Sequence, residues 1–242
     1  MLFGAQTVSF SLLFLASLVM AVGSAVQAAA GFGLGLLVVP LLVLIDPGYV
    51  PGPMLAAAVV VTASASYRDR TAINWPSLNL ALIGLAIGTV IGVVALRALA
   101  GVDTSKVFGG LILLAVALSV SGLAFRATKP AIMVGGGLGG VMGAMVGLQG
   151  PPLALVLQNE PPAQVRAMLN AYFTIACIWT VLVLAAAGLF RGEEVLKSLV
   201  LLPGACLGLA VAPYLADRFN GPRLRTFILA VSTGSAALLL SR

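Results

Sequence analysis

The sequence contains no histidine, only two cysteines and few charged residues. Lys, Arg, Asp and Glu make up 8% of its 242 residues, whereas a soluble domain needs about a quarter to cover its surface. Without histidine, the commonest general base and the commonest metal ligand are both missing. Cys177 and Cys206 lie in separate apolar runs with no zinc or disulfide spacing, so we expect both to pack as small core side chains. We expect neither a metal nor a cofactor.

Hydrophobic residues, in contrast, fill 61% of the chain. The mean hydropathy of +1.15 suits a lipid solvent, in which one helical span takes about 20 apolar residues. The apolar runs fall at about residues 7–30, 34–45, 53–67, 78–100, 106–125, 131–157, 163–190, 195–215 and 222–241. Most are long enough to span a bilayer, but the run at 34–45 is too short to do so alone. The sequence therefore predicts an all-α polytopic membrane protein with about eight transmembrane helices, forming a single transmembrane domain over residues 1–242.

The basic residues do not point to nucleic acid. The formal net charge is +6, but the thirteen Lys and Arg residues stand mostly singly between apolar runs. They are better explained as anchors that fix the orientation of the spans. We therefore expect membrane lipids as partners and no nucleic acid. Residues 1–12 contain no Lys or Arg, so a retained first helix fits better than a cleaved signal peptide.

The chain also carries a trace of an internal repeat. A shift of 116 residues superimposes four pairs of glycines: Gly23 and Gly139, Gly31 and Gly147, Gly88 and Gly204, and Gly92 and Gly208. Many transporters are built from two such halves, here about residues 7–125 and 126–242. Gly88-x-x-x-Gly92 and Gly204-x-x-x-Gly208 are best explained by close helix packing.

The charges favour inverted halves. If each half opens with a broken segment that enters and leaves on one side, three full spans follow and the two halves have opposite orientations. One side then holds Arg68, Arg70, Arg126, Lys129, Arg166, Arg218, Arg223 and Arg225, and the other holds Arg97, Lys106, Arg191, Lys197 and Arg242. This excess makes the first side cytoplasmic. If residues 7–45 cross only once, the two sides are nearly balanced and no orientation is favoured.

Two glycine- and proline-rich stretches interrupt the apolar runs. They are Gly31-Phe32-Gly33-Leu34-Gly35 with Pro40, and Gly147-Leu148-Gln149-Gly150-Pro151-Pro152. In a helix interior glycine costs about 1 kcal/mol and proline about 3 kcal/mol relative to alanine, so both stretches should be unwound. Unwound backbone in a membrane survives only where protein or a water-filled cavity satisfies its polar groups. Each break is therefore a candidate ligand site, as in the discontinuous helices of secondary transporters.

The breaks suggest an anionic ligand. No charged residue lies near the centre of any predicted span, whereas a half-helix N-terminus offers free N–H groups and about half a positive charge. We expect substrate contacts from Gly31, Gly33 and Gly35 at the first break and from Gln149, Gly150 and Pro151 at the second, with Gln27 and Asn170 as amide donors. For Gln27 and Asn170 an interhelical hydrogen bond is the alternative that we favour.

A further glycine stripe, formed by Gly135, Gly139, Gly143 and Gly147, leads into the second break. Such a stripe allows close helix packing or a helix that slides and bends, and it serves a homodimer as readily as internal packing. A homodimer is therefore possible.

At these residues the chain resembles a known family. The pattern G-x-G-x-G-x4-P at residues 31–40, followed by G-x-x-G-P-P-L-A-L at 147–155, is similar to that of the sulfite exporter TauE/SafE family of membrane permeases. The resemblance covers the whole chain and implies movement of sulfite, organosulfonates or similar anions across the cytoplasmic (cell inner) membrane. Leu34 departs from the three consecutive glycines more usual there, and its bulk would narrow the site.

The residues and the resemblance together predict a secondary transporter, an exporter of a small sulfur-containing anion working by alternating access. A channel would use the same breaks, and a non-transporting membrane scaffold is a third alternative. We expect no enzyme, because candidate hydroxyls such as Thr62 and Ser64 have no base beside them in the sequence.

Overall fold

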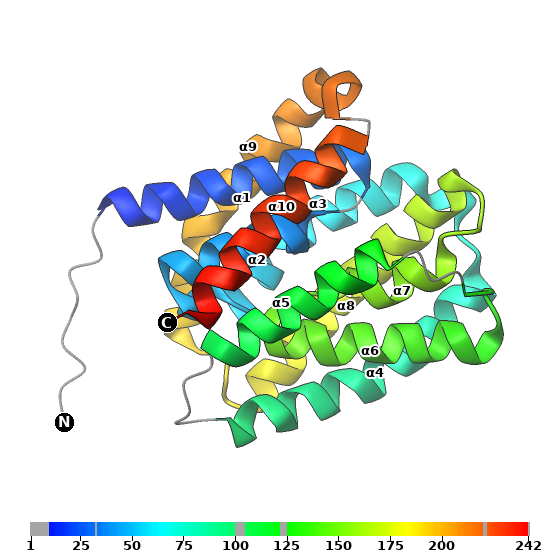
Figure 1. The fold of residues 1–242 in the computed structure, drawn as a ribbon, viewed down its shortest axis with the longest axis horizontal. Helices are drawn as coiled ribbons and strands as arrows, with labels where there is room; N and C mark the ends of the chain where they lie inside the picture. The colour runs from blue at the N-terminus through cyan, green and yellow to red at the C-terminus, as the bar shows by residue number, and fades with distance from the viewer. Residues whose placement is uncertain (1–9, 32, 100–104, 122–124, 220–221, 242) are drawn as a thin grey trace.

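A computed structural model describes residues 10–31, 33–99, 105–121, 125–219 and 222–241, and within those ranges every regular element is a helix. The side chains of 29–30, 105 and 215–225, which include Arg218, Arg223 and Arg225, lie outside the described parts. The helices are α1 (Phe10–Ala30), α2 (Leu34–Ile45), α3 (Gly52–Asp69), α4 (Trp75–Ala98), α5 (Ser105–Val120), α6 (Lys129–Val146), α7 (Gly150–Leu157), α8 (Pro162–Ala186), α9 (Gly192–Phe219) and α10 (Pro222–Leu240). Short 3-10 turns, η1 (Pro47–Tyr49) and η2 (Arg70–Ala72), follow α2 and α3. Figure 1 shows them as one bundle of roughly aligned helices.

Five of these helices are long and apolar enough to cross a membrane. The candidate spans are Phe10–Ala28, Trp75–Ala98, Lys129–Val146, Pro162–Ala186 and Gly192–Tyr214. Shorter apolar helices occupy Leu34–Ile45, Lys106–Val120 and Thr226–Leu240. The chain is therefore a multi-pass, all-helical membrane protein, and the predicted runs begin and end within a few residues of the helices, because long apolar runs in lipid must be helical.

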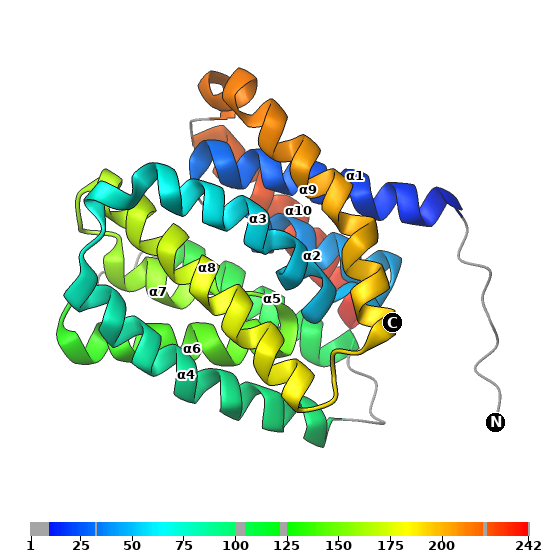
Figure 2. The same cartoon turned by 180° about the vertical axis from the view of Figure 1, so that it is seen from behind.

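The closest helix pairs join segments that are far apart in the sequence. α4 packs along α6, α1 along α9, α3 against α8 and α5 against α10, as Figures 1 and 2 show from opposite sides. A Cβ on Gly88 would collide with the backbone of Gly137 on α6, and one on Gly204 with the backbone of Ser17 on α1. Both G-x-x-x-G pairs thus let two helix backbones touch, which confirms their predicted packing role.

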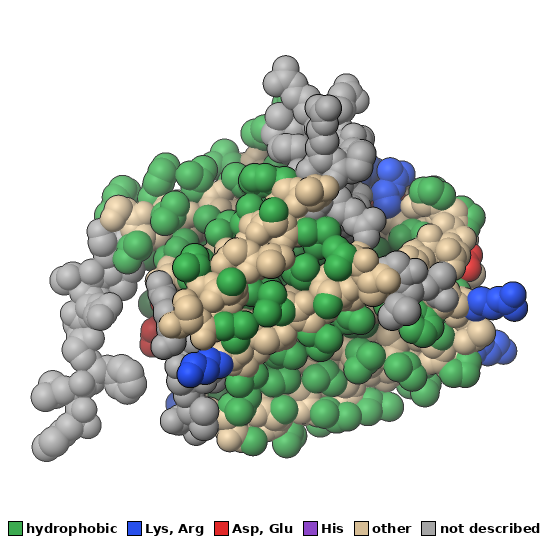
Figure 3. All heavy atoms as spheres, viewed as in Figure 1, with side chains coloured by type: hydrophobic (Ala, Val, Ile, Leu, Met, Phe, Trp, Pro, Cys, Tyr) green, Lys and Arg blue, Asp and Glu red, His purple; other side chains and the backbone are tan. Residues whose placement is uncertain are grey.

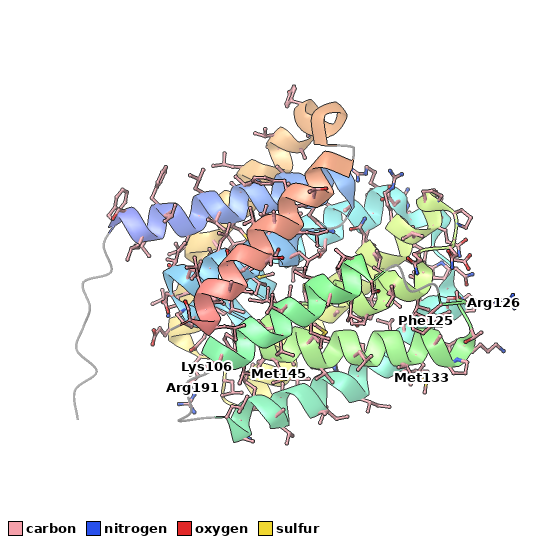
Figure 4. The ribbon with its side chains drawn as sticks, viewed as in Figure 1. Lys106, Phe125, Arg126, Met133, Met145 and Arg191 are labelled. Carbon is pink, nitrogen blue, oxygen red and sulfur yellow. The ribbon has the colours of Figure 1, made fainter. Side chains whose placement is uncertain are left out.

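Charged residues gather at the two ends of the bundle. Figure 4 places Lys106 and Arg191 at one end and Arg126 at the other, and Figure 3 shows a broad apolar band between the ends. We name these the Lys106 end and the Arg126 end. The α3–α4, α5–α6 and α7–α8 connections lie at the Arg126 end, and α4–α5 and α8–α9 at the Lys106 end. α1 runs toward the Arg126 end and α2 runs back.

The break after α1 is shorter than the glycines and Pro40 suggested. α2 is helical from Leu34 onward and continues through Pro40, so the unwound part is confined to residues 31–33. Pro40 has no N–H to donate to the Leu36 carbonyl one turn earlier. The Ser232 hydroxyl of α10 lies within hydrogen-bonding distance of that carbonyl and of the Ile228 carbonyl. A side chain from another helix thus satisfies the group that the proline leaves unpaired, and α2 stays helical.

Replacing Ser232 with alanine should therefore destabilise the protein. The half-buried Leu36 carbonyl would lose its hydroxyl partner, at a cost of about 1 kcal/mol. Thr233→Ala is the matched control, because the exposed Thr233 hydroxyl bonds only to Leu229 of its own helix. Thermal unfolding in detergent should show a lower Tm for Ser232→Ala than for Thr233→Ala; equal values would contradict this role.

Candidate functional site

The first break is held by the side chain of Gln27. α1 gives way to a left-handed Gly31, with φ +80°, and α2 begins after Gly33, with φ +107°. The Gln27 amide nitrogen donates to the Gly31 carbonyl over 3.2 Å, and its oxygen accepts from the Leu34 N–H over 3.3 Å. One amide side chain therefore replaces two of the backbone hydrogen bonds that the break removes.

The second break has the same form. α6 ends at Val146, and Gly147 adopts a left-handed conformation with φ +78°. Pro151 and Pro152 do not lie in the unwound segment, as the sequence suggested, but in the first turn of α7. Proline is tolerated there, because the first N–H groups of a helix have no intrahelical partner. The unwound stretch is therefore limited to residues 147–149.

The two breaks touch each other and line one cavity. A Cβ on Gly35 would lie 3.3 Å from Leu148 Cδ2 and 3.4 Å from the Gly147 carbonyl oxygen. The cavity has a volume of about 310 Å³ and includes residues 33–36 and 147–151 in its wall. Segments more than a hundred residues apart in the chain thus form the floor of one site.

Four further helices complete the wall. α3 contributes Met54, Leu55, Ala58 and Thr62, α8 contributes Val165, Leu169, Phe173 and Cys177, α5 contributes Leu118 and Ser119, and α10 contributes Ile228 and Leu229. The α8 residues recur every four positions, so one stripe of that helix faces the cavity. This wall is mostly apolar, with polar groups near the breaks and at the rim.

The cavity opens toward the Arg126 end. Gln158, at the end of α7, is exposed, and Val165 in the first turn of α8 is half-buried. Met54, Leu55 and Leu148, which line the opposite part, are at most 2% exposed. Access therefore improves toward the α7–α8 connection, which lies at the Arg126 end in Figure 1.

Six of the eight residues expected to contact a substrate line the cavity. They are Gln27, Gly33, Gly35, Gln149, Gly150 and Pro151. Gly31 and Asn170 are not among the lining residues. Gly31 instead packs against Arg166, whose Cγ would lie 2.9 Å from a Cβ on Gly31.

Asn170 is hydrogen-bonded to Gln27, a cavity-lining residue, and does not itself line the cavity. It is fully buried, and its side-chain oxygen accepts a 2.9 Å hydrogen bond from Gln27 Nε2. Its amide nitrogen lies 3.5 Å from Asp69 Oδ2 at the end of α3. Of the two explanations left open by the sequence, the structure shows the interhelical hydrogen bond, which links the first break to α8 and α3.

Gln149 joins the second break to α8 and α6. Its Nε2 donates to Thr180 Oγ1 over 3.3 Å, and its oxygen lies 3.6 Å from Cys177 Sγ. A Cβ on Gly143 would meet the Gln149 side chain. The stripe of α6 glycines thus makes room here for the break, and Gln149 lines the cavity while bridging two helices.

Fewer backbone donors face the cavity than two complete helix N-termini would supply. The first four N–H groups of a helix have no partner within it. In α7, two of these positions are Pro151 and Pro152, which carry no N–H. In α2, the Leu34 N–H already bonds to Gln27. The remaining backbone candidates are Gly33, Gly35 and Leu36 at the start of α2 and Gln149 and Gly150 at the start of α7.

The Leu34 side chain lies between the cavity and α1. Leu34 lines the cavity, but its Cγ would lie 3.8 Å from a Cβ on Gly23 of α1. Part of the side chain therefore packs toward α1, and Leu34 narrows the site less than expected.

Cys177 is buried as predicted, whereas Cys206 is exposed on α9, which corrects the prediction of core packing for Cys206. Within the described ranges no three His, Cys, Asp or Glu side chains gather as metal ligands would.

Comparison with known proteins now decides the family. The family model "Sulfite exporter TauE/SafE" matches residues 15–239. The chain belongs to the TauE/SafE family of sulfite exporters. It is also 27% identical over 233 residues to a protein of Cupriavidus necator named "Probable sulfite/organosulfonate exporter TauE", covering 90% of each chain. No solved structure matches the chain. Both breaks lie inside the family match, so they belong to a membrane transporter.

The sequence reasoning missed the cavity residues on α3, α5, α8 and α10. Leu169, Phe173 and Ile228 stand in apolar runs like those that face lipid, and one sequence gives no signal that separates the two environments. Asp69 was also missed, because it lies at the end of an apolar run beside Arg68 and Arg70. Its contact with Asn170 depends on the meeting of α3 and α8.

A cysteine placed in the wall provides a test of the cavity. In a background of Cys177→Ala and Cys206→Ala, which removes both native thiols, we expect a small charged methanethiosulfonate reagent to label Leu155→Cys, at a half-buried position of the wall, from the Arg126 end. The control is Leu182→Cys on the exposed, lipid-facing side of α8, which should resist a water-borne reagent. Labelling in vesicles of known orientation measures both rates; equal rates at positions 155 and 182 would contradict the open cavity.

Proposed function

We propose that this protein is a secondary transporter that exports a small sulfur-containing anion across the cytoplasmic membrane. The single observation that carries the proposal is that both helix breaks line one cavity. Free N–H groups beside unwound backbone suit an anion. The family is one of exporters, and the relative's name includes sulfite and organosulfonate, which supports sulfur oxyanions as the substrate class.

We propose eight spans in two inverted halves, with the broken pairs α1–α2 and α6–α7 each opening one half. The packing pattern supports this. The two halves correspond helix by helix: α1 to α6, α2 to α7, α3 to α8, α4 to α9 and α5 to α10. Under this correspondence the packed pair α1–α9 matches the packed pair α6–α4, and the pairs α3–α8 and α5–α10 each match themselves. Matched helices also run in opposite directions in Figure 1. Gly31 and Gly147, which correspond under the 116-residue shift, share the left-handed conformation.

The proposed mechanism is alternating access around the breaks. The tight α1–α9 and α4–α6 contacts each join the two halves of the sequence. The units that rock are therefore two interleaved bundles, α1–α2–α3–α9 and α6–α7–α8–α4, because rocking whole sequence halves would break these contacts. The interface between them is α3 against α8, which carries the Asn170 contact to Asp69.

The Lys106 end is the closed side in this account, because Met54, Leu55 and Leu148, which line the part of the cavity opposite the opening, are at most 2% exposed. The ion pair between Lys197 and Asp46 at that end lies inside one bundle, where it ties α9 to the end of α2. The cavity opens at the opposite, Arg-rich end, which the positive-inside rule makes cytoplasmic. A substrate would then load from the cytoplasm, as export requires.

Flux in liposomes tests the proposed function. Purified protein should give saturable uptake and counterflow of sulfur oxyanions, whereas sulfate and acetate serve as comparison anions. Gln149→Ala and Gly33→Leu should each lower the flux at least tenfold: the first removes the bridge from the break to α8, and the second forces a side chain onto a left-handed residue beside Ile228.

Two other outcomes would reject the proposal. Flux that does not saturate and shows no counterflow would indicate a channel. No flux of any anion under an imposed potential would favour a scaffold.

A further inference from the structure

The size and lining of the cavity bear on which oxyanion it takes. Its volume of about 310 Å³ equals at least about ten water molecules at roughly 30 Å³ each. Sulfite has only four non-hydrogen atoms and would fill a small part of this space. Thr62, Ser119 and Gln158 add polar side chains to the lining, but most of the remaining wall is apolar. It includes Leu118, Leu155, Val165, Leu169, Phe173 and Ile228, which offer a polar ion nothing to bind.

Two of these apolar side chains stand directly beside the breaks. A Cβ on Gly33 would lie 3.2 Å from Ile228 Cδ1, and one on Gly150 would lie 3.0 Å from Phe173 Cζ. An anionic group at the backbone donors therefore has a hydrocarbon surface next to it. From Phe173 the apolar wall continues along α8 through Leu169 and Val165 toward the open end.

The charge available at the breaks matches one negative charge better than two. Each half-helix N-terminus is equivalent to about half a positive charge, so both together offset about one unit. Among the described lining side chains there is no Lys or Arg to offset a second. Sulfite carries one or two negative charges around neutral pH, whereas an alkanesulfonate carries one. An uncompensated charge is costly in a low-dielectric site.

We propose that this cavity selects singly charged sulfonates with an apolar tail over sulfite. This inference rests on the proposed transport function and adds the substrate class to it. The sulfonate oxygens bind at residues 33–36 and at Gly150. Phe173 and Ile228 pack against the first carbons of the tail. The rest of the tail lies along Leu169, Leu155 and Val165. Burial of the tail supplies affinity that the few backbone donors do not.

The test is counterflow in liposomes with straight-chain alkanesulfonates of one, three and five carbons, and with sulfite at two pH values. Each buried methylene should tighten half-saturation by up to about fourfold, so the five-carbon sulfonate should bind at least tenfold tighter than methanesulfonate. Sulfite should be weakest at the higher pH, where more of it carries two charges. Protein-free liposomes correct for passive entry of the longer tails.

Variants of the apolar wall test tail binding. Leu155→Ala and Leu169→Ala should each reduce the gain per methylene by half or more. Leu182→Ala, on the exposed face of α8, is the control and should leave the gain per methylene unchanged. Leu155 is only half-buried, so its variant keeps the test valid if Leu169→Ala fails to fold.

The outcomes distinguish this inference from the proposed function. Saturable flux with no dependence on tail length, or with sulfite bound more tightly than pentanesulfonate, would overturn the substrate preference alone. No saturable flux for any anion would overturn both the preference and the transport function.

Discussion

Backbone polar groups in a membrane need partners inside the protein, and the rest of this structure depends on how that need is met at two places. Where α1 and α6 end in mid-bundle, N–H and C=O groups lose their helical partners. Gln27 bonds two of them at the first break, and Ser232 reaches the carbonyl that Pro40 leaves free. The few donors left over face the cavity, where a substrate can use them.

The same requirement explains the division between rigid and adjustable parts. Backbone contact at Gly88 and Gly204 fixes α4 on α6 and α1 on α9, and such contacts leave little freedom to slide. The polar links between the two interleaved bundles are of another kind: single amide hydrogen bonds that join Asn170 of α8 to Gln27 of α1 and Asp69 of α3. These are easily exchanged, so motion is most readily accommodated between the bundles.

Much of this architecture could be predicted from the sequence because lipid leaves few alternatives. An apolar run must be helical in a membrane, and glycine at Gly31 and Gly147 marks where a left-handed residue ends each helix. The role of proline was harder to predict: Pro40 and Pro151 sit inside helices, because one is compensated by a distant serine and the other occupies a first turn.

The apolar side of the site could not be predicted in this way. Leu169 and Phe173 face the cavity, while Leu182 on the same helix is exposed. All three lie in one apolar run, so only the packing of α8 against its neighbours separates them. The Gln27–Asn170 contact likewise joins residues 143 positions apart, and the sequence left it as one of two alternatives.

The central claim is that the two helix breaks form one anion site, and the most direct measurement is to locate a bound ligand. A structure determined with a bromine-labelled propanesulfonate would place the bromine by its anomalous scattering and the sulfonate by its density. Our account predicts the sulfonate in contact with both residues 33–36 and Gly150, and the bromine beside Leu169 on the α8 wall. A sulfonate bound at only one break, or outside the cavity, would contradict it.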